Sequence, residues 1–460
     1  MLKRIYITGI AAMALSATSC NLVNVVDVDP VSQLPAKQAI TNIGQANSAL
    51  YGTYSVLKSG LEMNVYYPAT ACLLGGSFAP GTSAGNAEIG FYNNDVKPDV
   101  YTLDAIYTKM YAVINYSNYL ILYVPKIETP DTRKNEILGE AKFLRALCNF
   151  YLLRMFGQHY DINSKYGIVL RDKPAESAAS TPRNTVKECY DMILADLDDA
   201  IAKAPTYTKT IFASKQAAKG LKAKVLLYKK DYAAAAALAK QVIDEGPFKL
   251  EKTFYDIWVK KIFGTTEAMF QLPYDDKNDR NNKAFMYRSY YLPSQYYKQQ
   301  LAGDKRDTGS ISLTTAGDLR SKKFTNNIFP GSGQTLTADT EYFLRLAELY
   351  LIRSEAIVRS NGSLQDARDA INAIRQRAVM PDITTNDPAE LLELIRKEKL
   401  LELGAESGED WFDLVRYASL GNIDITKVKP GVTSPSKYVM PLPDITVQLS
   451  NGVVFQNPNY

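Results

Sequence analysis

The stretch from Arg345 to Ala378, RLAELYLIRSEAIVRSNGSLQDARDAINAIRQRA, shows the fold class of this chain most directly. Its first half places apolar residues on one face of a helix, at Leu346, Leu349, Tyr350, Ala356 and Ile357. Asn361-Gly362-Ser363 then supplies a helix stop followed by a helix start. A second apolar stripe follows, at Ala367, Ala370, Ile371, Ile374 and Ala378. The stretch therefore predicts two antiparallel helices joined by a tight turn, a helical hairpin.

A second hairpin is expected earlier in the chain. Leu221 to Tyr228 and Tyr232 to Ile243 both have helical patterns, and the turn Lys229-Lys230-Asp231 separates them. Small residues, Ala223 and Ala233 to Ala237, allow the two backbones to approach closely, as in tetratricopeptide (TPR) units. Because the two hairpins are not adjacent in sequence, the chain is not an uninterrupted solenoid.

The rest of the chain divides into further predicted helices and two insertions without helical periodicity. Further helices are predicted at about 35–58, 104–124, 133–156, 185–203 and 389–403. Residues 59–103 and 247–341 interrupt the helical pattern and are rich in Gly or in Tyr, Asn and Asp. Loops of that length are uncommon unless they are functional. We expect a single, mainly α-helical domain with TPR-like hairpins on one side and these two insertions forming a binding face on the other.

The N-terminus predicts export and a lipid anchor. Lys3 and Arg4 precede a short apolar run, so residues 1–19 read as a signal peptide. Leu15-Ser16-Ala17-Thr18-Ser19-Cys20 resembles a bacterial lipobox, after which the mature domain would span 20–460 with lipid attached to Cys20. Two acyl chains on one cysteine suffice for stable anchoring. The alternative is a simple secretory signal in which this cysteine has no role.

Composition excludes some function classes. The chain has 460 residues, with 53 basic against 49 acidic side chains. This near balance argues against a nucleic-acid partner, which requires a basic surface. No P-loop, dinucleotide-binding fingerprint or HExxH motif occurs. We therefore predict no cofactor.

Aromatic residues are the main binding candidates. Six of them lie within thirteen positions: Phe285, Tyr287, Tyr290, Tyr291, Tyr296 and Tyr297. A sugar ring packs its C–H face on an aromatic plane, while its hydroxyls need polar partners. Grouped tyrosines are equally often core residues. The predicted ligand-binding residues, all from the two insertions, are Tyr67, Tyr92, Asn93, Tyr287, Arg288, Tyr290 and Tyr291.

Other polar groups favour structural roles, so no catalytic or metal-binding residue is predicted. His159 is the only histidine and cannot belong to a multi-histidine metal site. Glu398, Glu402 and Glu406 follow i+4 spacing, which favours ion pairs with neighbours such as Arg396 and Lys399 over a carboxylate site. The acidic run from Asp275 to Asp279 hints at calcium, but it lacks the glycine and closing glutamate of an EF-hand, so a polar turn is favoured.

Several blocks together resemble the SusD/RagB family. They are Gly139 to Ala146 (GEAKFLRA), Leu153 to Gly157 (LRMFG), the stretch from Glu341 to Ala378, Trp411 to Arg416 (WFDLVR), Pro441 to Pro443 (PLP), and Gln456 to Tyr460 (QNPNY). They lie in family order across nearly the whole mature chain. One departure is Glu406 to Asp410, where one extra residue and an acid replace the family's acidic-Gly-x-Arg pattern. It affects only the expected ion pairs at that helix end.

The resemblance implies a function. Members of this family are surface lipoproteins of the Bacteroidetes outer membrane that pair with a SusC-like TonB-dependent transporter. It implies a non-enzymatic protein that binds oligosaccharides and delivers them to that transporter. Peptide capture by the same architecture is an alternative, since the family also serves peptide uptake. A hydrolase using paired carboxylates is a third hypothesis, although no Asp or Glu pair is marked out for it.

Overall fold

The structure is a computed structural model that describes residues 39–175, 180–260, 265–274, 282–324 and 339–460. The signal peptide, Cys20 and the acidic run from Asp275 to Asp279 lie outside these residues. The described chain is mainly helical, at 57% helix, and forms one domain. Its strands form three two-stranded antiparallel pairs, β1–β3, β2–β6 and β4–β5. The predicted fold class is therefore confirmed.

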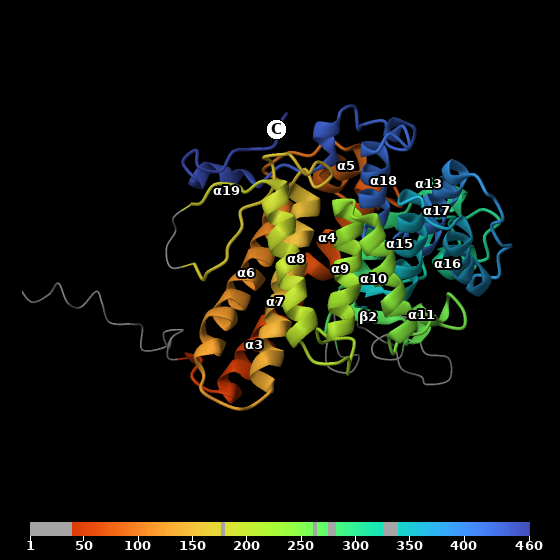
Figure 1. Cartoon of the computed structure of the whole chain (residues 1–460). Helices are drawn as coiled ribbons and strands as arrows, with labels where there is room; N and C mark the ends of the chain where they lie inside the picture. Colours follow the sequence, from red (N-terminus) through yellow and green to blue (C-terminus); the bar gives the residue numbers. More distant parts are fainter. Residues whose placement is uncertain (1–38, 176–179, 261–264, 275–281, 325–338) are drawn as a thin grey trace, which may run out of the picture.

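Long helices form the centre of the molecule. They are α3 (Ile43–Lys58), α6 (Tyr101–Tyr123), α7 (Arg133–Phe156) and α8 (Val186–Lys203). Helix α7 lies between α6 and α8 (Figure 1), and it begins and ends where the sequence predicts. Its residues from Phe143 to Phe156 are all buried, so this part of α7 lies inside the main hydrophobic core. At Gly139 an added Cβ would lie 2.1 Å from the backbone nitrogen of Ala204, so glycine there permits the close approach of the end of α8.

Both predicted hairpins are present. The first consists of α9 (Lys215–Lys229) and α10 (Tyr232–Glu245), and the second of α15 (Leu346–Arg359) and α16 (Leu364–Arg377). Lys230 and Asn361 turn the chain with positive φ angles of 70° and 55°. Helices α10 and α15 pack together, so hairpins distant in sequence are neighbours in space. Helices α17 (Pro388–Leu403) and α18 (Glu409–Ser419) continue this layer.

The insertions contain more regular structure than predicted. Residues 59–103 include η2 (Glu62–Tyr66), α4 (Tyr67–Gly75), β1 (Phe78–Pro80) and α5 (Asn86–Asn93). All nine residues of α4 are buried, so the helix has no polar face and no amphipathic pattern to detect. Loop-rich is therefore the wrong description of this insertion.

The second insertion holds short elements. They are α11 (Asp256–Lys260), β2 (Ala268–Gln271), α12 (Lys283–Ser289), β3 (Tyr291–Pro293), α13 (Gln295–Gln300), α14 (Asp307–Ser310), β4 (Ile311–Leu313) and β5 (Leu319–Ser321). Strand β6 (Tyr342–Arg345) then leads directly into α15. The chain ends with 3₁₀ turns η4 (Ile425–Lys427) and η5 (Pro435–Tyr438) and helix α19 (Asp444–Leu449). A further 3₁₀ turn, η3 (Val124–Lys126), follows α6.

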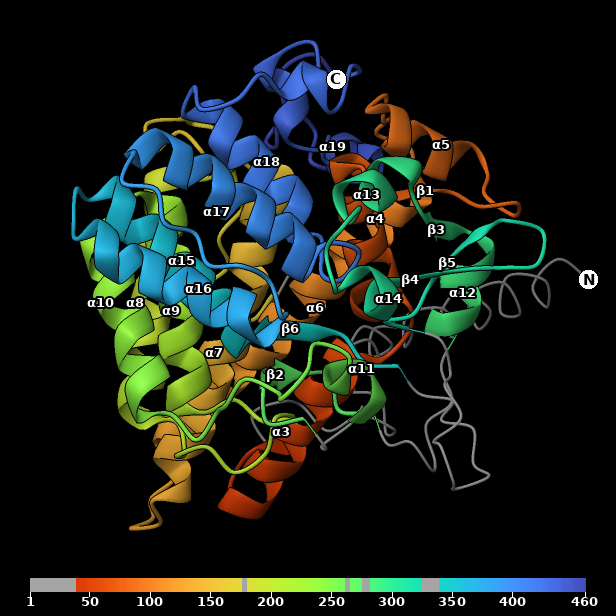
Figure 2. The same cartoon turned by 90° about the vertical axis from the view of Figure 1, so that its right-hand side faces the viewer.

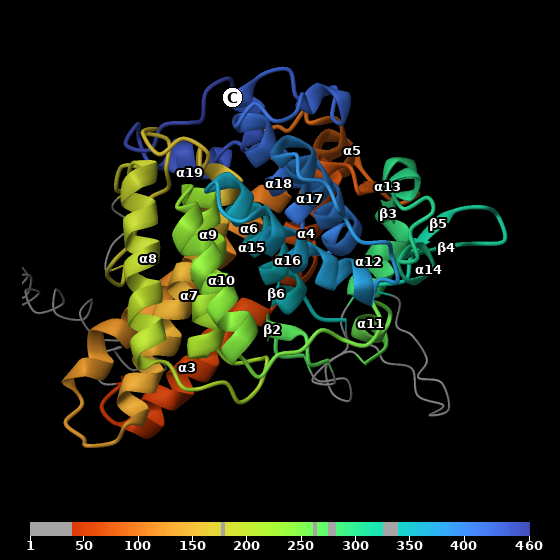
Figure 3. The same ribbon diagram turned by 45° about the vertical axis from the view of Figure 1, so that its right-hand side comes forward.

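Hairpins and insertions lie on different sides of the molecule. Figure 2 shows α8, α9, α10, α15 and α16 on one side and α5, α12, β1 and β3 on the other. In the intermediate view of Figure 3, α12 and β3 again lie away from α8 and α10. Among the described residues, no helix combines the length and apolar character needed to cross a membrane. The expected separation is confirmed for these elements, while Phe248 and Met269 of the second insertion pack in the core of the hairpins.

Candidate functional site

The two insertions are joined by a short sheet. Strand β1 pairs antiparallel with β3, so that Phe78 lies opposite Pro293. The pairing continues beyond the strands, because the N–H of Gly81 donates to the Tyr290 carbonyl at 2.8 Å and the N–H of Ser83 to the Ser289 carbonyl at 3.0 Å. A Cβ at Gly81 would lie 2.3 Å from the Ser289 oxygen, so this approach requires glycine.

Three of the predicted ligand-binding tyrosines are core residues. Tyr67 is 1% exposed and packs against Tyr151, with ring centroids 4.8 Å apart. Tyr287 is fully buried, and Tyr291 is 2% exposed with its ring 5.9 Å from that of Tyr287. Because a ligand on the surface cannot reach them, the prediction is wrong for Tyr67, Tyr287 and Tyr291.

The other four candidates are accessible but do not form one group. Asn93 and Arg288 are exposed, and Tyr92 and Tyr290 are partly buried. Tyr92 lies at the end of α5, where the Nζ of Lys429 is 4.4 Å from its ring centroid and donates to its carbonyl. Tyr290 instead lies beside the β1–β3 sheet. Only Tyr290 among these four is placed where the two insertions meet.

Three tyrosines gather at that meeting point, and we call Tyr66, Tyr101 and Tyr290 the tyrosine surface. Tyr101 begins α6 and is 70% exposed. Tyr66 ends η2, and its pKa is raised, first by partial burial and then by the neighbouring phenol of Tyr101 and the carboxyls of Glu62 and Glu88. The phenol of Tyr290 contributes to the same shift. Because η2 also contacts both α6 and α12, and Tyr290 directly follows α12, these groups share one local environment built from both insertions.

Carboxylates lie beside the rings. The Tyr291 hydroxyl donates to Oε1 of Glu88 at 3.4 Å, and the Gly85 N–H donates to Oε2 of Glu88 at 2.8 Å. Glu62 faces the Nζ of Lys109 at 3.6 Å, and its Oε2 is buried without a hydrogen-bond partner among the described residues. Aromatic faces next to oriented acceptors are the combination that a sugar ring and its hydroxyl groups require.

Sequence reasoning missed Tyr66, Tyr101 and Glu88. The pair Tyr66-Tyr67 was visible, but neighbouring residues of a helix point in different directions, so only one ring of such a pair faces solvent. Which ring is exposed depends on how η2 and α4 pack against the core. No local signal marks Tyr101, whose position becomes informative only when α6 is placed beside η2.

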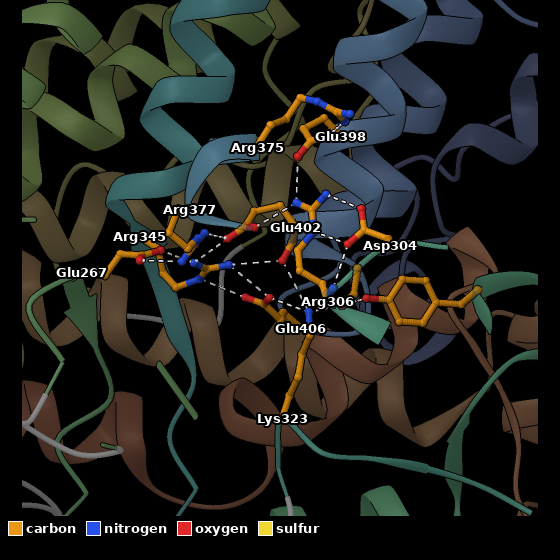
Figure 4. A network of polar contacts seen from close by, with 12 residues as sticks. Glu267, Asp304, Arg306, Lys323, Arg345, Arg375, Arg377, Glu398, Glu402 and Glu406 are labelled. Atoms are coloured by element: carbon orange, nitrogen blue, oxygen red, sulfur yellow. Dashed lines mark hydrogen bonds and ion pairs between the residues drawn. The ribbon is translucent and has the colours of Figure 1, made fainter. Parts of the chain in front are cut away.

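Glu398 and Glu402 on α17, and Glu406 just after it, belong to a buried ion network (Figure 4). Arg306 contacts Glu398 at 2.8 Å and Glu402 at 3.1 Å. Arg345 contacts Glu406 at 3.0 Å, and Lys323 contacts the same carboxylate at 2.7 Å. The predicted partners are wrong, since Arg396 pairs with Glu393 and Lys399 with Glu355 and Asp413. A structural role is nevertheless what the contacts support, because each carboxylate faces arginine or lysine.

A serine motif occurs without its partners. Gly81 to Gly85 follows the Gly-x-Ser-x-Gly pattern and lies between β1 and α5, as a nucleophile elbow would. His159, however, is 2% exposed and packs against Tyr228 and Phe412. Burial, and then the charge of Arg154, lower the pKa of His159 to about 3. The only histidine of the chain therefore belongs to the core, and Ser83 has no general base of that type.

Metal-binding groups give no alternative site. Within the described ranges, no three His, Cys, Asp or Glu residues are arranged so that they could hold a metal ion. Cys72, Cys148 and Cys189 are buried free thiols. Burial raises the pKa of the Cys189 thiol to about 12, which keeps it protonated and unreactive.

Comparison with known proteins agrees with this architecture. The sequence profile of the SusD family matches residues 259–460, and a profile described as starch-binding associating with outer membrane matches residues 79–227. SusD-like protein P38 of Formosa agariphila is 24% identical over 90% of this chain and 91% of its own length. A SusD-like protein of Bacteroides ovatus is 23% identical over 68% of this chain and 65% of its own.

Solved structures share the fold. A laminarin-binding SusD-like protein superimposes with a TM-score of 0.77 at 21% identity, covering 91% of this chain and 99% of that one. A putative sugar-binding protein from Bacteroides vulgatus gives a TM-score of 0.76 at 22% identity, covering 92% and 99%. Fold, matched profiles and relatives agree: the chain belongs to the SusD/RagB family, whose members are binding proteins and not enzymes.

Proposed function

We propose that this protein binds oligosaccharides at the tyrosine surface and delivers them to a SusC-like TonB-dependent transporter. The observation that carries the proposal is the joining of the two insertions, which brings Tyr66, Tyr101 and Tyr290 together beside Glu62 and Glu88. Exposed aromatic rings on a rigid helical scaffold are typical of recognition surfaces. The relatives described as laminarin-binding and sugar-binding support a glycan as the ligand.

The proposed location is the outer membrane, with the protein exposed at the cell surface. Residues 1–19 would be removed, and the binding domain 20–460 would be held by lipid on Cys20. The matched profile associated with the outer membrane supports this location. The transporter partner rests on family membership.

The tyrosine surface is tested by removing two rings. In a Tyr66→Ala/Tyr290→Ala variant we expect affinity for a bound oligosaccharide to fall tenfold or more, because one stacking ring contributes on the order of 1–3 kcal/mol. Laminarin is the first glycan to test, by isothermal titration calorimetry, followed by a glycan array. Tyr116→Ala is the matched control, since Tyr116 is a 47% exposed tyrosine far along α6 from Tyr101.

Three outcomes would count against this proposal. Equal affinity in the folded double variant and the wild type would remove Tyr66 and Tyr290 from the ligand contacts. Binding of peptides but of no glycan in parallel screens would replace the proposed ligand class while leaving the site in place. A loss as large in the Tyr116→Ala control would show that the effect is not specific to the tyrosine surface.

Attachment is expected to depend on Cys20. A Cys20→Ala variant should move from the membrane fraction to the soluble fraction, measured by cell fractionation in a strain that lacks the partner transporter. Cys72→Ala is the control, because Cys72 is buried and cannot take a lipid in the folded protein. Membrane retention of the Cys20→Ala variant would contradict the lipid anchor.

A further inference from the structure

A pocket lies apart from the tyrosine surface. It has a volume of about 420 Å³ and shares no lining residue with the tyrosine surface. Its walls come from the segment before α11, from α14, from the end of β5 and from the end of α16. This volume is within the range of small-molecule sites in proteins, about 300–1,000 Å³.

The lining carries positive charge. Four basic residues, Lys305, Arg306, Lys322 and Arg377, line the pocket, and no Asp or Glu among the described residues does. Arg306 and Arg377 belong to the ion network of Figure 4, where five basic side chains face five carboxylates. That network is neutral as a whole. In the described part of the chain neither Lys305 nor Lys322 forms an ion pair with a carboxylate. These two lysines therefore give the pocket a positive net charge.

Arg377 keeps a hydrogen-bond donor unused. Its side chain is 4% exposed, with one terminal nitrogen 3.1 Å from Glu267 and the other bound to Glu402. Among the described residues, however, its Nε has no acceptor. Because that nitrogen is buried from solvent, a ligand in the pocket cannot reach it, and Arg377 contributes to the pocket wall only.

The pocket also offers apolar surface at its rim. Tyr255 is 40% exposed, and the Nζ of Lys322 lies 5.3 Å from its ring centroid while donating to the Thr308 carbonyl at 2.5 Å. Val379 is 75% exposed and has a φ of 57°, in the left-handed region that β-branched residues avoid. This residue directly follows the C-cap of α16, where the Met380 N–H donates to the Arg375 carbonyl at 2.8 Å, so its backbone conformation belongs to the helix cap.

We propose that this pocket is a second saccharide site that binds a sugar residue carrying a carboxylate or a sulfate. Lys305 and Lys322 would pair with the anionic group, and Tyr255 would pack against the ring. The proposal rests on the proposed function only in taking a glycan as the ligand. It adds a preference for acidic glycans, which the tyrosine surface with its two carboxylates does not provide.

The test uses monosaccharides, which probe the pocket without requiring the tyrosine surface. Glucuronate, galactose 6-sulfate, glucose, galactose and inorganic sulfate would each be titrated at low salt into the mature protein and followed by NMR. We expect both acidic sugars to bind at least tenfold more tightly than the neutral ones, and the Lys305→Gln/Lys322→Gln variant to lose that preference. The relative affinities of glucuronate and galactose 6-sulfate identify which anionic group is preferred.

A charge-matched control separates the pocket from general electrostatics. Lys209 and Lys427 are exposed and outside the pocket, so Lys209→Gln/Lys427→Gln lowers the net charge equally and should keep the preference. The preference should also persist in the Tyr66→Ala/Tyr290→Ala variant, which makes failure of the two sites distinguishable. Equal binding of acidic and neutral sugars, equal loss in the control, or binding of inorganic sulfate as tight as that of galactose 6-sulfate would overturn the proposal.

Discussion

Replacing Glu402 by alanine is expected to lower the free energy of unfolding by about 3–5 kcal/mol, because removing one member of a buried ion pair leaves uncompensated charge. The Glu402 side chain is fully buried and contacts Arg306, Arg345 and Arg377. Urea denaturation of the purified protein at neutral pH measures the effect. Glu393→Ala on the same helix is the control.

The control pair is much more exposed. The Glu393 side chain is 39% exposed and contacts Arg396 and Lys397, and surface pairs of this kind contribute about 0–1 kcal/mol. If the Glu402→Ala and Glu393→Ala variants lost equal stability, the buried network would have no special role. A loss below about 1 kcal/mol for Glu402→Ala would lead to the same conclusion.

Glu402 is also expected to make the free energy of unfolding depend on pH in the acid range. Burial alone would raise the pKa of Glu402, but the charges of Arg377, Arg345 and Arg306 outweigh it and lower the pKa to about 2. A carboxylate whose pKa is lower in the folded state stabilises the fold above its unfolded pKa, about 4.3. That stabilisation is lost as pH falls from this value through about 2. The difference in stability between wild type and Glu402→Ala should therefore narrow over this range.

A Gly408→Ala substitution is expected to cost about 2–5 kcal/mol, the sum of backbone strain and overpacking. Gly408 begins α18 with a φ of 82°, and an added Cβ would lie 2.2 Å from the Cβ of Ala71 on α4. Gly421→Ala separates the two contributions, because Gly421 has a φ of 72° but open space around it. We expect that variant to lose only the strain, about 1–2 kcal/mol.

Thermal and urea unfolding of both glycine variants would measure these differences. Adding Ala71→Gly to Gly408→Ala should recover part of the loss, since it removes the atom that the new side chain meets. Equal destabilisation of the Gly408→Ala and Gly421→Ala variants would show that α4 and α18 adjust to the added methyl group without cost. In that case the close packing of these helices would not depend on glycine.

Helices with one polar face could be predicted from the sequence. The limits of α7 were predicted without error, and those of α10, α15 and α16 nearly so, because apolar stripes and turn residues such as Asn361 and Gly362 mark them. The end of α9 was predicted to within one residue, but the helix begins at Lys215, six residues before the predicted start. Helix α4 could not be found in this way. It is buried on all sides and therefore shows only an apolar run without periodicity.

The site was predictable only in part. The two insertions were identified as its source, but in both Tyr66-Tyr67 and Tyr290-Tyr291 the second ring is buried and the first is partly exposed. That choice depends on packing between segments distant in sequence. The partners of Glu402 also depend on such packing, since Arg306, Arg345 and Arg377 come from three separate elements. Helical spacing reveals neighbours along one helix and cannot reveal these.

The pairing of β1 with β3 has a consequence for the order of folding. Glu88 and Tyr291, which meet through it, are 203 residues apart in the chain. Contacts between such distant residues form slowly, because a large loop must close before they are made. The hairpins, whose contacts are local, can fold first. The tyrosine surface therefore cannot be complete until residues 289–293 have paired with β1 and the segment that follows it.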